Sequence, residues 1–240
     1  MYQNITEILR NEMKRDFVSV DIDKNPVAQM LTDGSTAFDC YQVIAQYCIF
    51  PENIVRFLQN ARDVMEESGF TEIAEELERN IGEELGTQSA GKSHYDMLTE
   101  SLQRELGYSV DTQMPCPSSS RFVNEMKAHT SHSSVAYVAG AVYALEASAK
   151  PELEIVQAFI DHSISLRNGI GIMDTELKLF FDGHIDTWEP GHEEGLREEF
   201  DKYLEAVDAE DFKQGFRSVM HTMDSWWQGL YQRFSGGNSE

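Results

Sequence analysis

The chain has few cysteines and no pair of them in a metal-binding or redox spacing. Cys40, Cys48 and Cys116 are the only three in 240 residues, and no CxxC occurs. Three thiols cannot all pair with one another, so the composition argues against a disulfide framework and against a thiolate zinc site. Any metal ion would have to be bound by oxygen and nitrogen.

Basic residues and long apolar runs are scarce as well. Lysine and arginine number 19 against 42 aspartates and glutamates, which gives a formal net charge of −23. Nucleic acids and anionic membrane surfaces require basic contact surfaces, so we expect neither as a partner. No stretch approaches the roughly 20 apolar residues of a membrane span. The N-terminal MYQNITEILRNEMKRDF is typical of an amphipathic helix and not of a signal peptide, so we expect a cytoplasmic protein.

Strand patterns are nearly absent, and helical periodicity covers most of the chain. The alternating VSVDID at 18–23 is short and has no partner hairpin, whereas apolar residues recur elsewhere at three- and four-residue steps. Pro51 and Pro151 fit first helical turns, and Ser35 and Asp208 fit N-caps. We predict helices at 2–16, 36–49, 52–68, 71–86, 92–106, 121–149 with a break near 130, 151–167, 173–188, 192–207 and 209–233.

The remaining segments predict loops and a tail. Residues 108–120 are rich in Pro and Ser, and 167–174 contain two glycines, so both are expected on the surface. The length suits one sizeable core. We therefore predict one all-α domain over residues 1–234 and a disordered tail over 235–240.

The stretch from Asn80 to His94 places carboxylates and an imidazole close together. Carboxylate oxygen and imidazole nitrogen are typical iron donors, often on facing helices. In an unbroken helix, at about 100° per residue, Glu83 and His94 would share a face. Two glycines between them make an unbroken helix doubtful. Spacing alone therefore leaves Glu83 and Glu84 both open as donors.

A second set of candidates lies in the later helices. Glu146 is set in the small, apolar AYVAGAVYALEASA, where a buried carboxylate is unfavourable unless it is paired or bound to metal. The alternative is a position at the exposed edge of the helix.

The segment LFFDGHIDTWEPGHEEGL contains His184, Glu189 and His192. In a regular α-helix the two histidines would lie about 80° apart, with Glu189 about 140° from His184, too wide for shared metal ions. A π-bulge absorbs one residue and brings all three to one face. Pro190 provides a local reason, because it lacks an N–H and clashes with the carbonyl four residues back. Asp186 stays open as the alternative acid.

Together these segments, over about 80–196, resemble the haem-oxygenase-like diiron oxidases and oxygenases. Those proteins often carry Asn, then an acidic pair followed by one residue and Gly, and a His ten residues after the ligand Glu; Asn80, Glu83-Glu84-Leu85-Gly86 and His94 match. Their last ligand helix usually has His, three residues, an acid, two residues and His, so this chain has one residue more before the acid. The resemblance assigns metal binding to Glu84, His94, Glu146, His184, Glu189 and His192.

The resemblance also implies a fold and a chemistry. The expected fold is a haem-oxygenase-like (TenA/PqqC-like) helical bundle, with two Fe(II) ions as cofactor and O₂ as co-substrate. Family members oxidise amino acids or fatty acids in natural-product biosynthesis. Length and overall pattern most resemble the nitrile-forming member that acts on a halogenated tryptophan, which implies an amino acid as the small-molecule substrate. A homodimer is also possible.

Two aromatic residues are candidates for a substrate cavity, and two other functions are alternatives to the oxygenase. Tyr143 and Phe181 flank the ligand helices and are candidates for the wall of a substrate cavity. One alternative is a metal-free hydrolase on the same scaffold, of the TenA type, which would use a cysteine nucleophile. The other is a non-enzymatic helical interaction protein with an acidic surface.

Overall fold

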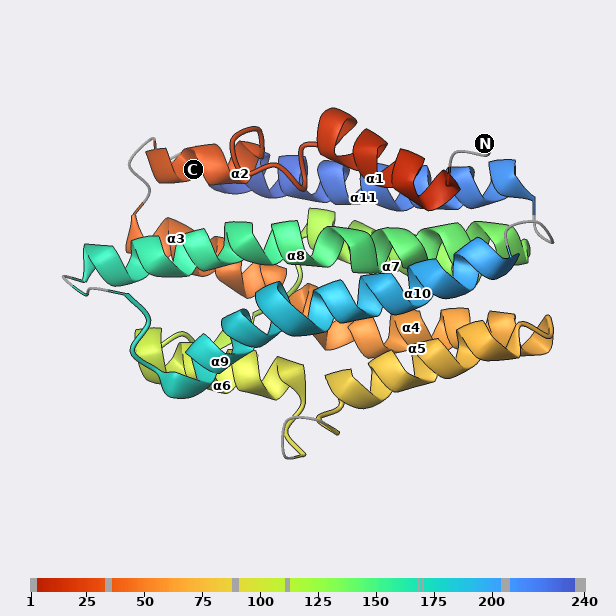
Figure 1. Cartoon of the computed structure of the whole chain (residues 1–240). Helices are drawn as coiled ribbons and strands as arrows, with labels where there is room; N and C mark the ends of the chain where they lie inside the picture. The colour runs from red at the N-terminus through yellow and green to blue at the C-terminus, as the bar shows by residue number, and fades with distance from the viewer. Residues whose placement is uncertain are drawn as a thin grey trace.

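The computed structural model describes residues 4–32, 36–87, 91–110, 113–167, 169, 171–203 and 208–235. Over these residues the chain is helical and has no strand, so the prediction of an all-α protein is confirmed (Figure 1). The helices are α1 (Ile5–Asp16), α2 (Pro26–Thr32), α3 (Ala37–Tyr47), α4 (Ile49–Glu67), α5 (Thr71–Glu84), α6 (His94–Leu106), α7 (Pro117–Thr130), α8 (Val135–Leu166), α9 (Thr175–Gly183), the π-helical η2 (His184–Trp188), α10 (Glu189–Tyr203) and α11 (Ala209–Phe234). None of these helices combines the length and apolar character needed to cross a lipid bilayer.

Helix α8 is the centre of the bundle and packs against α11, α10, α3 and α4 (Figure 1). Its contact with α11 is unusually close because glycines face backbone on both sides. A Cβ added at Gly140 would lie 1.8 Å from the carbonyl oxygen of Phe212, and one at Gly215 would lie 1.9 Å from that of Tyr137. The two backbones therefore approach each other with no side chain between them, which fixes how α8 lies across α11.

The prediction that Pro151 begins a new helix is wrong. Pro151 lies inside α8, which continues from Val135 to Leu166. Proline removes one backbone hydrogen bond from a helix interior, but this part of α8 is buried and its neighbours hold it in place. The predicted break near 130 is confirmed, because α7 ends at Thr130 and Ser134 caps the start of α8.

Most other helix starts follow local capping signals. Pro51 lies in the first turn of α4 and Asp208 caps α11, as predicted. Helix α2 was not predicted, although the Asn25 side chain accepts from the N–H groups of the two residues after Pro26, a usual N-cap arrangement. Thr36 caps α3, whereas the predicted cap Ser35 lies outside the described residues.

One predicted loop is shorter than expected, the other has the expected bounds between α8 and α9, and some predictions are not tested. Helix α7 begins at Pro117, inside the loop predicted over 108–120, and Asp174 caps α9 at the end of the loop predicted over 167–174. Residues 236–240 of the predicted tail lie outside the described part of the chain. The division into one domain and a tail stays a prediction.

The ligand-bearing segment near the C-terminus is one helical run and not two helices. It extends from Thr175 to Tyr203, and its middle is η2, so the predicted π-bulge is confirmed. The N–H of Glu189 donates to the carbonyl of His184, five residues back. Gly183 leaves room for the bulge, because a Cβ there would lie 2.6 Å from the indole of Trp188. The extra residue is thus absorbed directly before Glu189.

Candidate metal centre

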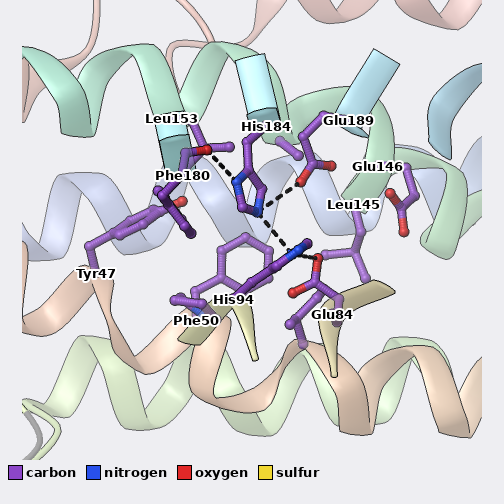
Figure 2. Close-up of a pocket in the computed structure, with 13 residues that line it drawn as sticks. Tyr47, Phe50, Glu84, His94, Leu145, Glu146, Leu153, Phe180, His184 and Glu189 are labelled. Carbon is purple, nitrogen blue, oxygen red and sulfur yellow. Dashed lines mark hydrogen bonds and ion pairs between the residues drawn. The ribbon is translucent and has the colours of Figure 1, made fainter. Parts of the chain in front are cut away.

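Four parts of the bundle contribute acidic and histidine side chains to one buried cluster (Figure 2). Glu84 is the last residue of α5, His94 is the first of α6, and Glu146 lies in the middle of α8. The run from η2 into α10 provides His184, Glu189 and His192. Each of the six is at most 9% exposed. Burying so many ionisable groups is unfavourable unless charges are balanced or a metal ion is bound.

The first group of donors is Glu84, His94 and His184, whose donor atoms all lie within 4.8 Å of one another. Nδ1 of His94 is 3.1 Å from Oε1 of Glu84 and 3.1 Å from Nε2 of His184. Nδ1 of His184 lies 2.6 Å from the carbonyl oxygen of Phe180, which can only accept. The Nδ1–H therefore donates outward, and the lone pair of Nε2 points into the cluster, as in histidines that bind metal.

The second group is Glu84, Glu189 and His192, again with donor atoms within 4.8 Å of one another. Nδ1 of His192 lies 3.8 Å from Oε2 of Glu189 and 3.5 Å from Oε2 of Glu146. The Asn80 amide is 3.5 Å from the other oxygen of Glu146. Glu84 belongs to both groups, so its carboxylate lies between two possible metal positions.

A tight turn brings Glu84 and His94 together. Gly86 has a φ of +98°, which favours glycine, and a Cβ there would lie 2.5 Å from the carbonyl oxygen of Lys92. Ser93 then caps α6 through the N–H of Asp96. The first residue of α6 therefore lies beside the last residue of α5.

Burial and mutual contacts set the charge states in the cluster. Burial lowers the pKa of His184 to about 3, so this imidazole is neutral. Burial also raises the pKa of Glu189 to about 7. For His192 burial acts in the opposite direction, but the carboxylates of Glu146 and Glu189 outweigh it and raise its pKa to about 12. The carboxylates thus require positive charge beside them, which a divalent cation would supply on displacing the His192 proton.

The structure separates the alternative acids that the sequence left undecided, Glu83 from Glu84 and Asp186 from Glu189. Glu84 faces His94, whereas the neighbouring Glu83 lies behind the cluster and contacts the outer nitrogen of His192 at 2.7 Å. Glu189 is buried in the cluster, and Asp186 is exposed on η2. The expected six donors therefore lie together, with Glu83 and Asp186 outside the donor set.

A cavity of about 530 Å³, its open mouth included, adjoins the donors (Figure 2). Besides the cluster, its walls are aromatic and aliphatic. They consist of Tyr47, Phe50, Pro51, Ile54, Leu145, Ala149, Leu153 and Phe180.

The prediction that Tyr143 and Phe181 line this cavity is corrected, since neither is part of its wall. The Tyr143 hydroxyl donates to Glu193, and its ring packs against phenylalanines of α10 and α11. Phe181 is fully buried beside Phe180. Periodicity placed both on helices near the donors but could not say which face meets the cavity.

Sequence reasoning also missed the indole beside the histidines. Trp188 stacks on the His94 ring, with ring centroids 4.6 Å apart and planes 12° apart, and meets His184 edge to face. Its position inside the predicted bulge was the one available signal. Tyr47 and Phe50, from the junction of α3 and α4, carry no local signal and reach the cavity by long-range packing.

Comparison with known proteins gives a matching family and similar solved structures. The model of the family described as "Domain of Unknown Function with solved-structure structure (DUF3865)" matches residues 3–233. No curated protein matches the chain.

One solved relative is a CadD-like protein of unknown function from Nostoc punctiforme PCC 73102, and two of its crystal structures are similar to this chain. The structure at 2.00 Å resolution is 34% identical, with 95% of this chain and 96% of that chain covered and a TM-score of 0.86. The structure at 1.35 Å is 31% identical, with 98% and 97% covered and a TM-score of 0.86. The relative therefore has the same fold as this chain.

Proposed function

This chain belongs to the DUF3865 family, and from that premise and the buried donor cluster we propose that it is a non-haem diiron oxygenase. It would use O₂ to oxidise a small molecule. The observation that carries the proposal is the pair of overlapping donor groups that share Glu84, because two metal positions joined by one carboxylate are what a dinuclear centre needs.

The chemistry of the donors fits iron. Three carboxylates and three imidazoles are oxygen and nitrogen donors of the kind that suits iron, and the cluster holds no thiolate. The solved relative is described as CadD-like, and CadD belongs to a diiron-type haem-oxygenase-like family. The sequence pattern of the six donors resembles the same family. Both similarities support iron over a metal of other donor preference.

The chain's residues would divide the work around the metals. Glu84, His94 and His184 would hold one ion, and Glu146, Glu189 and His192 the other, with Glu84 between them. When bound, two Fe(II) ions supply the electrons that reduce O₂. The hydrogen bond from His184 to the Phe180 carbonyl orients one imidazole. The apolar wall would limit the access of water to the reacting atoms, and a drier site strengthens the charge interactions within it.

The cavity favours a substrate with an apolar body. Its walls offer aromatic and aliphatic side chains, and none of the described residues that line it is Lys or Arg. A charged group of the substrate would therefore lie towards the metal ions and the carboxylates. We propose an amino-acid-derived substrate in natural-product biosynthesis, with conversion of a halogenated tryptophan to an indole nitrile as the most specific candidate.

The cavity gives no support to a cysteine hydrolase. No cysteine is among the described lining residues. For Cys116 burial is outweighed by hydrogen bonds with Ser118 and Ser119, which lower its pKa, but this thiol does not line the cavity. Burial raises the pKa of both Cys40 and Cys48. A thiol with a raised pKa is a poor nucleophile at neutral pH. An interaction protein without enzymatic activity would have no need of a buried donor cluster beside a cavity.

Anaerobic loading with Fe(II), followed by metal analysis and O₂ exposure, tests the proposal. We expect two irons per chain, O₂ uptake that depends on iron, and a product from candidate amino acids identified by mass spectrometry. A variant with Glu84 changed to Ala should lose both irons, whereas Glu154→Gln, on the exposed face of α8, should keep them. Full turnover by protein stripped of iron, or no iron uptake by the wild type, would refute the proposal.

A further inference from the structure

Glu83 is a buried carboxylate that lies behind the metal centre. Its side chain is 4% exposed, and Oε2 lies 2.7 Å from Nε2 of His192. A carboxylate oxygen accepts, so the Nε2–H of His192 donates to it. The opposite ring nitrogen, Nδ1, then faces the oxygens of Glu146 and Glu189. Glu83 thus contacts one face of the imidazole while the metal position lies at the other.

Glu83 is itself held by a cation on the same helix. Nη1 of Arg79 lies 2.5 Å from Oε1 of Glu83, and Nε of Arg79 lies 3.1 Å from Glu76. The three residues follow one another at three- and four-residue steps, so they form a row on one face of α5. Arg79 is 43% exposed at the side chain, so the row leads from solvent to the back of His192.

Helix α10 is shaped to receive this row. Gly195 lies one turn beyond His192, and a Cβ there would lie 1.9 Å from Oε1 of Glu76 and 3.3 Å from Nη2 of Arg79. The absence of a side chain at Gly195 lets Glu76 and Arg79 lie against α10. Helices α5 and α10 therefore contact each other at two places: His192 meets Glu83, and Gly195 meets Glu76 and Arg79.

The other two histidines of the cluster have no such support. The outer nitrogen of His184 donates to a neutral backbone carbonyl. The outer nitrogen of His94 is buried and has no hydrogen-bond partner in the described structure. Among the described histidines of the cluster, only His192 has an anionic outer partner, which makes the two metal positions chemically unequal.

We propose that Glu83, held in place by Arg79, is a positioning residue for His192 and selectively supports the metal position formed by Glu146, Glu189 and His192. This inference rests on the proposed function. A carboxylate on the outer nitrogen of a metal-binding imidazole fixes its tautomer and ring orientation and makes it a better donor. Glu83 contacts the outer nitrogen of His192, so it would act on the metal position through that imidazole.

Anaerobic titration with Co(II), followed by calorimetry and by the ligand-field absorption of the ion, separates the two positions. Wild-type protein should bind two equivalents. Glu83→Ala should weaken one equivalent about 10- to 100-fold, the usual effect of losing such a partner, and leave the other within about threefold. Glu83→Gln keeps an acceptor oxygen without the charge and should give an intermediate loss. Arg79→Met should weaken the same equivalent less than Glu83→Ala does.

Two further measurements separate a positioning role from a general loss of structure. Glu78→Gln is the matched control, because Glu78 lies on the same helix and pairs with Arg62 at the surface. It should bind both equivalents as the wild type does. In Zn(II)-loaded protein, the proton on Nε2 of His192 should give a downfield NMR resonance that Glu83→Ala removes and Glu83→Gln retains.

The metal titrations distinguish failure of this inference from failure of the proposed function. Equal weakening of both equivalents, or unchanged binding in Glu83→Ala, would overturn the inference while the proposed function stands. A wild-type protein that binds no metal would overturn both. The retained equivalent in Glu83→Ala serves as the internal check that the bundle is folded.

Discussion

Glu152 is a buried acid in the centre of the bundle, and its replacement by Gln makes a quantitative test of how burial controls charge. The residue follows Pro151 in α8, is 0% exposed, and neither carboxylate oxygen meets a donor with hydrogen-bond geometry. Burial raises the pKa of Glu152 well above its usual value, and the nearby Ser148 hydroxyl offsets only part of this. At a pH between the pKa of the unfolded chain and that of the folded protein, Glu152 therefore keeps a proton in the folded protein and releases it on unfolding.

The pH dependence follows from this difference in pKa. A glutamate in an unfolded chain has a pKa of about 4.3. Because the folded pKa is raised, the favourable contribution of Glu152 is complete below about pH 4.3 and is lost as the pH rises towards the folded pKa. The loss is about 1.4 kcal/mol per pH unit and reaches at most about 4 kcal/mol at pH 7. Gln has no proton to release, so Glu152→Gln should gain stability over the wild type as the pH rises. An amide without partners costs about 1–3 kcal/mol, but this penalty does not change with pH.

Urea denaturation of metal-free protein, followed by circular dichroism between pH 4 and pH 8, measures the difference. We expect the free energy of unfolding of Glu152→Gln minus that of the wild type to increase with pH. Glu154→Gln, at an exposed position on the same helix, should show no such increase. A difference that is flat over this range would mean that Glu152 ionises normally, and the reasoning from burial would be wrong.

Three further predictions concern the donors and the backbone. Glu84→Ala should abolish binding of both metal equivalents, since Glu84 belongs to both groups, and retention of either in calorimetry would contradict a shared carboxylate. Gly140→Ala should destabilise the fold by about 1–3 kcal/mol or more in thermal unfolding, because its Cβ would meet the Phe212 backbone, whereas Gly191→Ala meets no atom within 4 Å and should not. Pro190→Ala restores an N–H that permits regular α-helix before Glu189, so it should weaken the equivalent that uses Glu189, and unchanged Co(II) affinity would count against a role of Pro190 in the bulge.

The sequence predicted those features that depend on local spacing. The one-residue excess between His184 and Glu189, together with Pro190, predicted the π-helical segment that the structure contains. The helix starts at Pro51 and Asp208 followed local capping rules in the same way. Pro151 was misread because a proline is also tolerated where the surrounding bundle holds the helix together.

The features that depend on long-range packing were beyond prediction. Adjacent acids such as Glu83 and Glu84 point in different directions, and only the turn at Gly86 and the course of α10 decide which one meets His94 and which one His192. The cavity wall has the same origin, since Tyr47 comes from a helix junction nearly forty residues away from the nearest donor. Residue type and period carry no information about such contacts.

The π-helical segment has a consequence for insertions and deletions. One residue lost from the middle of a buried helix normally rotates everything beyond it by about 100° and separates the side chains on either side. Here the segment from His184 to Trp188 already holds one residue in excess of the α-helical repeat. Removal of Thr187, which is exposed, would let this turn relax to regular helix and leave His184, the acid and His192 on a common face. A chain that is one residue shorter at this point would therefore still place the donors on one face, in a regular α-helix and not in a π-helical segment.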